Sequence, residues 1–360
     1  MVSIQGRRPC RYKDPSWSSD SGSFRKSLCK IKMALICDDM TWQNFQGECE
    51  MIFLTPQNWY TAMEQFHPDL LFCESSWSGI ENYPQSWDYG VFHNRKLLVE
   101  NRRALLDIIK YCRKAGIPTV FWNKEDPFSF DDEVSNFVDT AMLFDHIFTT
   151  AAECVPLYVE RGHKSVHTMM FGFSPRLFSP LPFSGTENTA VFHGSWYANH
   201  AERCRDMCMI FDMAIKRGLK LKIYDRVSDA DNADRIFPEK YRPYIHESVP
   251  YGDVRATMSE AQFVININTV KDSKTMFARR VFETMACGRI VISNQSLGME
   301  EIFGDRVWFA DKPFDMSRMD EIIAANINEV FQCHTWRHRI ELMLKDIGFS
   351  PAASCKREGK

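Results

Sequence analysis

The chain has 360 residues, of which 44% are hydrophobic and 25% are charged, and this length favours two domains of ordinary size over a single α/β unit. Its formal net charge of −3 excludes the overall positive field with which nucleic-acid-binding proteins attract their ligands, so we expect no nucleic acid partner. The 12 cysteines lack paired spacing and several lie inside apolar runs, which argues against a disulfide framework and favours a reducing compartment.

The chain begins with a polar, basic and serine-rich segment, and we expect residues 1–30 to be a disordered leader. A basic leader can also contact an anionic membrane surface. No stretch is apolar over the length that crosses a bilayer, and no hydrophobic signal region follows the first residues. We therefore expect a cytoplasmic protein, with the leader as a point of peripheral contact at the cytoplasmic face of a membrane.

Strands alternate with helices over the first half of the chain. Apolar residues at helical spacing predict a helix over 97–115, which Gly116 ends. Short apolar runs predict buried strands at 32–37, 69–73, 119–122 and 146–149. This alternation predicts parallel βαβ units, and hence an N-terminal Rossmann-like domain over residues 31–183.

The alternation restarts after a linker-like stretch, LPFSG, at 181–185. Strands are predicted at 189–193, 219–224, 262–268, 289–293 and 307–310, and helices at 202–217, 275–287, 320–330 and 335–344. We therefore expect a second α/β domain over 184–330 and a C-terminal helix and tail over 331–360. Because ligands bind beyond the carboxyl ends of the strands in open α/β sheets, the residues just after each strand are the candidates for a site.

Residues 266–283, NINTVKDSKTMFARRVFE, are the strongest candidate. A strand ends in polar asparagines, and a helix predicted to start near Thr275 would offer free N–H groups and its positive dipole end to a diphosphate. The Glu283 carboxylate, two turns along, suits the two hydroxyls of a ribose. The alternative is a capped amphipathic helix with surface arginines. The candidate donor-binding residues here are Asn268, Ser273, Lys274, Thr275, Met276, Arg279, Arg280 and Glu283.

Two further segments follow predicted strands of the second domain. In HGSWYANHAER, at 193–203, a glycine permits close approach of a ligand, although an ordinary turn explains it as well. Arg226 can bind two phosphate oxygens at once, and Tyr251 can meet a base or simply fill a hydrophobic turn. These segments add the candidate donor-binding residues Gly194, Ser195, Tyr197, Arg203, Tyr224, Arg226, Val249 and Tyr251.

FWNKEDP, at 121–127, gathers four polar side chains just past an apolar strand, which is costly in a core and suits the wall of an active site. Glu125 or Asp126 is a candidate general base for an acceptor hydroxyl if transfer inverts the anomeric centre, and otherwise a residue that orients the acceptor. A local turn at Asp126 and Pro127 is the alternative. The candidate catalytic residues are Asn123, Lys124, Glu125, Asp126 and Glu74, with Trp77 nearby as a platform for a sugar.

The segment RRVFETMACGRIVIS, at 279–293, resembles the donor-site signature of group 1 glycosyltransferases with the GT-B fold. Within that class, the chain resembles the CgeB-like (spore maturation protein) glycosyltransferases. That resemblance extends over FLTPQNW (53–59), PDLLFCESSWSG (68–79), FWNKEDP (121–127), FDHIFTT (144–150), FHGSWY (192–197) and IYDR (223–226). In the wider class, two acidic residues eight positions apart often flank the nucleotide sugar. Here Glu283 corresponds to the second, whereas Thr275 stands at the first.

The resemblance implies an α/β GT-B fold, with two Rossmann-like domains facing each other across a cleft. It also implies transfer of a hexosyl or related sugar from a nucleotide-diphosphate sugar, UDP-type, to a glycan, lipid-linked saccharide or protein, as in polysaccharide biosynthesis. We expect neither a metal nor a cofactor.

Two other functions fit the same sequence. One is a nucleotide-sugar epimerase or hydrolase using the same cleft. The other is a non-catalytic module that binds glycans through its tryptophans, Trp77, Trp87, Trp122 and Trp196. The D-x-D spacing of Asp229 and Asp231 favours solvated turn residues over a metal site, and the pair His334 and His338 lacks a third zinc ligand.

Overall fold

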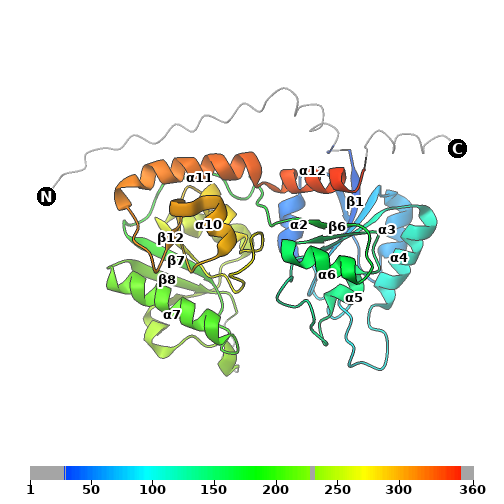
Figure 1. Cartoon of the computed structure of the whole chain (residues 1–360), viewed down its shortest axis with the longest axis horizontal. Coiled ribbons are helices and arrows are strands. Elements are labelled where there is room, and N and C mark those ends of the chain that lie inside the picture. The colour runs from blue at the N-terminus through cyan, green and yellow to red at the C-terminus, as the bar shows by residue number, and fades with distance from the viewer. Residues whose placement is uncertain (1–27, 29, 228–231, 350–360) are drawn as a thin grey trace.

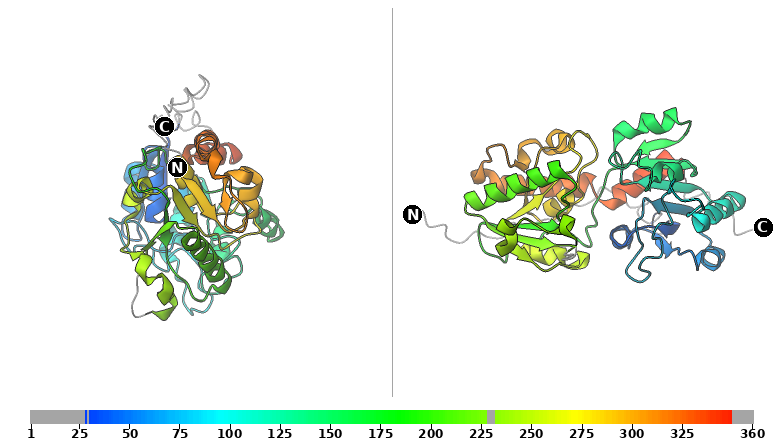
Figure 2. Two further views of the ribbon diagram at one scale, coloured as in Figure 1. Left: turned by 90° about the vertical axis from the view of Figure 1, so that its left-hand side faces the viewer. Right: turned by 90° about the horizontal axis from the view of Figure 1, so that it is seen from below.

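The computed structural model describes residue 28, residues 30–227 and residues 232–349. Almost all of the expected leader, the Asp229–Asp231 motif and the tail beyond residue 349 lie outside these residues. The described chain forms two six-stranded sheets, each in its own lobe, and all the strand pairs within them are parallel (Figure 1). A view from below shows the same two lobes lying side by side (Figure 2).

The first sheet has the strand order β2-β1-β3-β4-β5-β6. Its strands are β1 (Lys32–Ile36), β2 (Glu50–Phe53), β3 (Leu70–Glu74), β4 (Thr119–Asn123), β5 (His146–Thr149) and β6 (Val166–Thr168). The helices between them are α2 (Asp39–Phe45), α3 (Trp59–Phe66), α4 (Arg103–Ala115), α5 (Phe137–Ala141) and α6 (Val155–Glu160). The four strands predicted for this half are confirmed, and β2 and β6 were not predicted.

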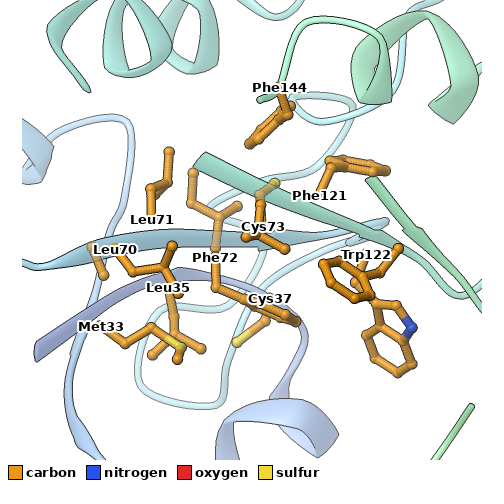
Figure 3. Packing of buried hydrophobic residues seen from close by; sticks show 14 of the residues in the cluster. Met33, Leu35, Cys37, Leu70, Leu71, Phe72, Cys73, Phe121, Trp122 and Phe144 are labelled. Atoms are coloured by element: carbon orange, nitrogen blue, oxygen red, sulfur yellow. The ribbon is translucent and has the colours of Figure 1, made fainter. Parts of the chain in front are cut away.

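The central strands of this sheet are buried on both faces, which explains why they appear in the sequence as continuous apolar runs. Figure 3 shows Phe72 and Trp122 on one side of the sheet and Leu71 and Phe121 on the other. All four side chains belong to one buried hydrophobic cluster. The buried strands thus form a rigid base for the loops at their carboxyl ends.

The helix predicted over 97–115 is too long at its start, because α4 begins at Arg103. The three consecutive apolar residues Leu97, Leu98 and Val99 are exposed in the preceding loop. The side chain of Asn101 holds that loop by donating hydrogen bonds to the carbonyls of Tyr89 and Phe92. Three adjacent apolar residues do not form a helical stripe, so nothing favours continuing the helix through them.

The second sheet has the strand order β12-β11-β10-β7-β8-β9. Its strands are β7 (Thr189–Gly194), β8 (Lys220–Asp225), β9 (Ile245–His246), β10 (Phe263–Asn266), β11 (Ile290–Ser293) and β12 (Trp308–Phe309). Its helices are α7 (Ala201–Lys216), α8 (Val254–Ser259), α9 (Arg280–Ala286), α10 (Leu297–Phe303) and α11 (Met319–Cys333). The five strands predicted for this half are confirmed, and β9 was not predicted.

The helix predicted to begin near Thr275 is the main correction, because α9 begins at Arg280 and has only 7 residues. The segment before it is irregular, and several of its N–H groups donate to nearby side chains. The amide of Ala278 donates to Asn268 Oδ1 at 3.0 Å, and the amide of Met276 donates to Ser273 Oγ at 2.9 Å. The prediction of a helix start at Thr275 is therefore wrong, and the amides of Met276 and Ala278 are not free for a diphosphate.

The chain returns from the second lobe to the first through its last described helix, α12 (Trp336–Asp346). Helices α11 and α12 follow each other across both lobes (Figure 1). Trp336 packs against Trp122 and Phe45, with ring centroids 5.2 and 5.0 Å apart, inside the first hydrophobic cluster. The first lobe is therefore completed by residues more than 150 positions beyond its last strand. No helix in the described part of the chain has the length and apolarity of a membrane span.

Candidate functional site

The carboxyl ends of the two sheets lie against each other. Asn44, in α2 after β1, donates from Nδ2 to the Tyr251 hydroxyl at 2.8 Å. Thr275, after β10, donates from Oγ1 to the Thr150 carbonyl at 2.8 Å, directly after β5. Residues that follow strands of one sheet thus contact residues that follow strands of the other, which is the position at which open α/β sheets bind ligands.

Four predicted arginines gather on the second-domain side of this interface. Arg203, Arg226, Arg279 and Arg280 come from α7, from the loop after β8 and from the start of α9. Burial lowers the pKa of Arg280 to about 9, and the charges of the other three arginines add to this effect against the attraction of Glu283. The prediction that these residues come together therefore holds geometrically, although α9 begins later than expected.

Arg280 is the arginine of this group with a buried nitrogen that lacks a hydrogen-bond partner among the described residues. Arg279 donates from Nε to Glu283 Oε1 at 3.0 Å, and Arg203 donates from Nη1 to the Ser195 carbonyl at 3.1 Å. By contrast, the buried Nε of Arg280 has no hydrogen-bond partner among the described residues. A buried N–H group without an acceptor is costly, and three neighbouring arginines repel the charge that carries it, so this arrangement favours binding of an anion.

Glu283 lies at the domain interface but is enclosed by neighbouring side chains. Its Oε1 accepts hydrogen bonds from the Tyr251 hydroxyl at 2.6 Å and from Arg279. Tyr251 in turn accepts from Asn44 of the first domain. Burial and the Glu283 charge raise the pKa of Tyr251, so its hydroxyl stays protonated and donates to the carboxylate. This chain of contacts holds Glu283 in a single orientation beside the arginines.

Tyr197 is surrounded by guanidinium groups. Arg203 and Arg235 lie over its ring, with distances of 5.1 and 4.2 Å to the centroid, and Arg226 donates to its hydroxyl at 3.1 Å. Burial alone would raise the pKa of Tyr197, but the charge and hydrogen bond of Arg226 and the charge of Arg235 lower it overall. Arg235 was not predicted, because it lies in a polar loop with no motif around it.

Gly194, three residues before Tyr197, lies where there is little room for a side chain. A Cβ added to Gly194 would lie 2.6 Å from the Phe192 ring, so a larger residue would force that ring to move. Ser195, next in the chain, is buried. His193 donates from Nε2 to Thr257 Oγ1 at 2.7 Å, because that hydroxyl itself donates to the Val254 carbonyl. The other ring nitrogen, Nδ1, is therefore a bare acceptor, and it is buried without a partner among the described residues.

Several predicted donor-binding residues have structural contacts instead. Lys274 is largely exposed and forms an ion pair with Glu301 at 2.9 Å. Asn268 and Ser273 bond the backbone of the segment before α9, as described above. Met276 packs against the hydrophobic cluster of the first domain, and Tyr224 stacks on His193 with ring centroids 5.0 Å apart. Val249 packs at the edge of a cluster in the second domain.

The first-domain side of the interface contains a buried ion network. Lys124 Nζ lies 2.7 Å from Asp38 Oδ2 and 2.8 Å from Glu74 Oε1. These residues follow or end the adjacent strands β4, β1 and β3, so the sheet itself brings them together. Burial raises the pKa of Glu74, whereas at Asp38 the charge and hydrogen bond of Lys124 outweigh burial and lower the pKa. Asp38 was not predicted as a site residue, although it ends the first apolar run.

Asp126 belongs to a separate buried network. Its Oδ2 accepts hydrogen bonds from Thr149 Oγ1 at 2.7 Å and from the Tyr158 hydroxyl at 3.0 Å, and its Oδ1 accepts from Asn123 Nδ2 at 2.8 Å. Burial raises the pKa of Asp126 to about 7. Both of its oxygens are occupied and its side chain is inaccessible, so Asn123 and Asp126 fix the loop after β4.

Glu125 differs from its neighbours because one of its oxygens is available. Oε1 accepts a hydrogen bond from the indole Nε1 of Trp77 at 3.0 Å, and Oε2 has no hydrogen-bond partner in the described part of the chain. Burial raises the pKa of Glu125, against the lowering effect of Lys124. Of the five predicted catalytic residues, Glu125 is therefore the one placed to accept a proton.

The two histidines of the discounted zinc pair have structural contacts, whereas Asp229 and Asp231 lie outside the described residues. Across residues 28–349, leaving out the gaps at 29 and 228–231, no group of three or more His, Cys, Asp or Glu side chains is arranged to hold a metal. His334 stacks on Phe282 with ring centroids 4.7 Å apart. His338 forms a capping box with Thr335 at the start of α12, so both histidines have structural contacts.

The sequence and the fold were compared with those of known proteins. Residues 213–345 match a family model described as glycosyl transferase-like. No curated protein matches the chain.

Among solved structures, a DNA-modifying beta-glucosyltransferase has a TM-score of 0.51 at 11% identity, with 89% of this chain and 100% of that chain covered. An alpha-glucosyltransferase in complex with UDP-glucose and DNA has a TM-score of 0.50 at 10% identity, with 86% and 95% covered. The T4 phage enzyme BGT, bound to UDP-glucose, has a TM-score of 0.50 at 9% identity, with 88% and 99% covered. The chain thus has the GT-B fold of two parallel-sheet α/β domains, and the glycosyl transferase-like match lies mostly in the second of them.

Proposed function

We propose that this protein is a glycosyltransferase that binds a nucleotide-diphosphate sugar, UDP-type, between its two domains. The observation that carries the proposal is the cluster of four arginines in which the buried Nε of Arg280 has no hydrogen-bond partner among the described residues. A diphosphate supplies the charge that this cluster lacks. The glycosyl transferase-like match over 213–345 includes Arg279, Arg280 and Glu283, which lie at the same place.

The donor would be held entirely by side chains and backbone of the second domain. Arg203, Arg226, Arg279 and Arg280 would bind the diphosphate, and Tyr197 would position Arg226. As the bond from the sugar to the diphosphate breaks, negative charge grows on the leaving group, and fixed guanidinium groups stabilise that charge without reorganisation. Four arginines can supply this stabilisation without a divalent ion, so we propose a metal-independent enzyme.

Glu283 and Tyr251 would meet the nucleoside. The Glu283 carboxylate is oriented by Tyr251 and Arg279, and since it is 1% exposed, one of these neighbours would have to move for it to accept hydrogen bonds from ribose hydroxyls. Tyr251 and the nearby backbone of Val249 would lie beside the base. This retains the roles predicted from the sequence for Glu283, Val249 and Tyr251.

The acceptor would approach from the first domain. We propose Glu125 as the general base that takes the proton of the acceptor hydroxyl when that oxygen attacks the sugar. Its raised pKa and its unbonded Oε2 suit this role. Lys124, Glu74 and Asp38 act through position, because they hold the loops that carry Glu125 and Trp77.

Finer assignments rest on the sequence. The segments listed for the CgeB-like glycosyltransferases run through both domains, and we propose that the chain belongs to that family. We also propose domain limits of 31–183 and 184–330, a cytoplasmic location, peripheral contact with the membrane through the leader, and a role in polysaccharide biosynthesis.

Thermal unfolding in the presence of UDP and EDTA tests the donor proposal. A ligand at 100 times its dissociation constant stabilises the folded protein by about 2.7 kcal/mol, which appears as a clear rise in the midpoint temperature. We expect this rise with UDP and a smaller one with uridine, which lacks the diphosphate. Equal midpoints with and without every nucleoside diphosphate would contradict the proposal.

A further inference from the structure

Trp77 presents a fixed aromatic surface at the first-domain side of the interface. Its side chain is 41% exposed, although it contacts Phe92 and Phe137 with ring centroids 5.6 and 5.1 Å away. The indole N–H is held by Glu125 at 3.0 Å. A large aromatic ring that is anchored at its edge and still exposed is a platform on which the apolar face of a sugar ring can stack.

The backbone of Trp77 is fixed as firmly as its ring. The amides of Trp77 and Ser78 each donate to Asp38 Oδ1 at 3.0 Å, and the Ser76 hydroxyl donates to the same oxygen at 2.6 Å. Asp38 is in turn held by Lys124. The ion network therefore positions the indole, and a ligand stacked on it loses little energy in ordering the protein.

The charges around Trp77 are predominantly negative. Asp38, Glu74 and Glu125 contribute three carboxyl groups, against the single ammonium of Lys124. A phosphate or carboxylate on the acceptor would be repelled here, whereas a hydroxyl group can donate a hydrogen bond to Oε2 of Glu125, since the oxygens of Asp38 and Glu74 already accept hydrogen bonds within the network. The arginines of the second domain have the opposite sign, so the two sides of the interface select different ligands.

From these observations we infer that the acceptor is an uncharged carbohydrate whose sugar ring stacks on Trp77 and whose attacking hydroxyl donates a hydrogen bond to Glu125 Oε2. This inference rests on the proposed function and names the acceptor class. It separates the protein from the DNA-modifying glucosyltransferase that shares its fold, because a nucleic acid brings a row of phosphates to the acceptor site.

Transfer from UDP-sugars to a panel of acceptors tests the inference. The panel contains neutral p-nitrophenyl hexosides, a p-nitrophenyl glucuronide, a hexose 6-phosphate and duplex DNA. We expect product with at least one neutral hexoside and none with the anionic sugars or DNA. Product with DNA or only with anionic sugars would overturn the inference, and so would the absence of any product while UDP still stabilises the protein.

Variants at Trp77 provide the second arm. Because stacking on the indole contributes to acceptor binding, Trp77→Ala should raise the KM for the hexoside by about tenfold or more and leave the KM for the donor unchanged, and Trp77→Phe should recover part of the loss. Phe183→Ala is the matched control, since Phe183 is 39% exposed but lies beside Arg289 at the opposite edge of the second sheet. An unchanged acceptor KM in Trp77→Ala would overturn the inference.

The proposed function and the inference fail in different ways. If UDP does not bind, the proposed function is wrong whatever the acceptor. If UDP binds and the donor is converted with no acceptor present, the protein is an epimerase or hydrolase. Both the transfer reaction and the inferred acceptor class are then wrong. If sugar transfer occurs and the acceptor KM does not change in Trp77→Ala, the proposed function stands and only the inference about the acceptor is wrong.

Discussion

The charged side chains on the two sides of the interdomain site differ in whether they have partners. On the first-domain side, Lys124 is enclosed between Asp38 and Glu74, and almost every donor and acceptor has a partner. On the second-domain side, Arg280 is repelled by three arginines and attracted by Glu283, and its buried Nε has no hydrogen-bond partner among the described residues. Paired charges hold a framework in place, whereas an unpaired buried charge indicates where a ligand of the opposite sign binds. The comparison thus separates residues that build the site from residues that bind.

The strongest test of the framework side is Lys124→Met. Removing the ammonium leaves two buried carboxyl groups facing each other, and breaking a buried pair in this way costs about 3–5 kcal/mol. We expect the free energy of unfolding, measured in urea, to fall by that amount. The triple variant Lys124→Met, Asp38→Asn, Glu74→Gln should lose much less, because no charge is left unpaired. Equal losses in both would show that Lys124 contributes through packing and not through its charge.

The matching test of the ligand side is Arg280→Ala. We expect transfer or UDP binding to fall by about 100-fold, since a charged contact to a phosphate is worth about 1.5–3 kcal/mol. The unliganded protein should be as stable as the parent or more stable, because the substitution removes an unpaired buried charge. The control is Arg242→Ala, whose parent side chain is 77% exposed. A large loss of stability without UDP would instead place Arg280 in the framework.

The pKa of Asp126 predicts a pH dependence of stability. Burial raises this pKa to about 7 in the folded protein from an ordinary value of 3.8. The folded state therefore binds the proton more tightly than the unfolded state, so the stabilisation is complete below the unfolded pKa and is lost as pH rises through 7. The contribution is at most about 1.4 kcal/mol per pH unit in that window.

Asp126→Asn should remove this slope between pH 5 and pH 7. Denaturant unfolding of both proteins across that range measures the difference, and the other carboxyl groups cancel because both proteins contain them. Identical slopes would mean that Asp126 is ionised in the folded state and belongs with the paired charges.

The smallest expected effect is that of Tyr251→Phe. The hydroxyl links Asn44 of the first domain to Glu283 of the second, and losing one such hydrogen bond costs about 1 kcal/mol. We expect UDP affinity, measured by calorimetry, to fall several-fold because Glu283 loses a contact that orients it. Tyr83→Phe is the control for removing an exposed tyrosine hydroxyl. Unchanged affinity would show that Arg279 alone orients Glu283.

The sequence by itself determined the order of elements and the chemistry of the site. Nine strands were predicted because each is a short apolar run buried on one or both faces, which is a local property of the chain. The arginines and Glu283 near α9, Glu125 after β4 and Gly194 at the end of β7 were chosen as candidates because ligands bind past the carboxyl ends of parallel strands.

Only the tertiary structure decided which of those residues are free to bind. Helix α9 begins only at Arg280, and the segment before it folds back so that the amide of Ala278 donates to the side chain of Asn268, ten positions earlier. Asp38 lies beside Lys124 and Glu74 because β1, β3 and β4, which are separated along the chain, are neighbours in the sheet. Whether a charge is paired or unpaired depends on such long-range contacts, which no local pattern of residues records.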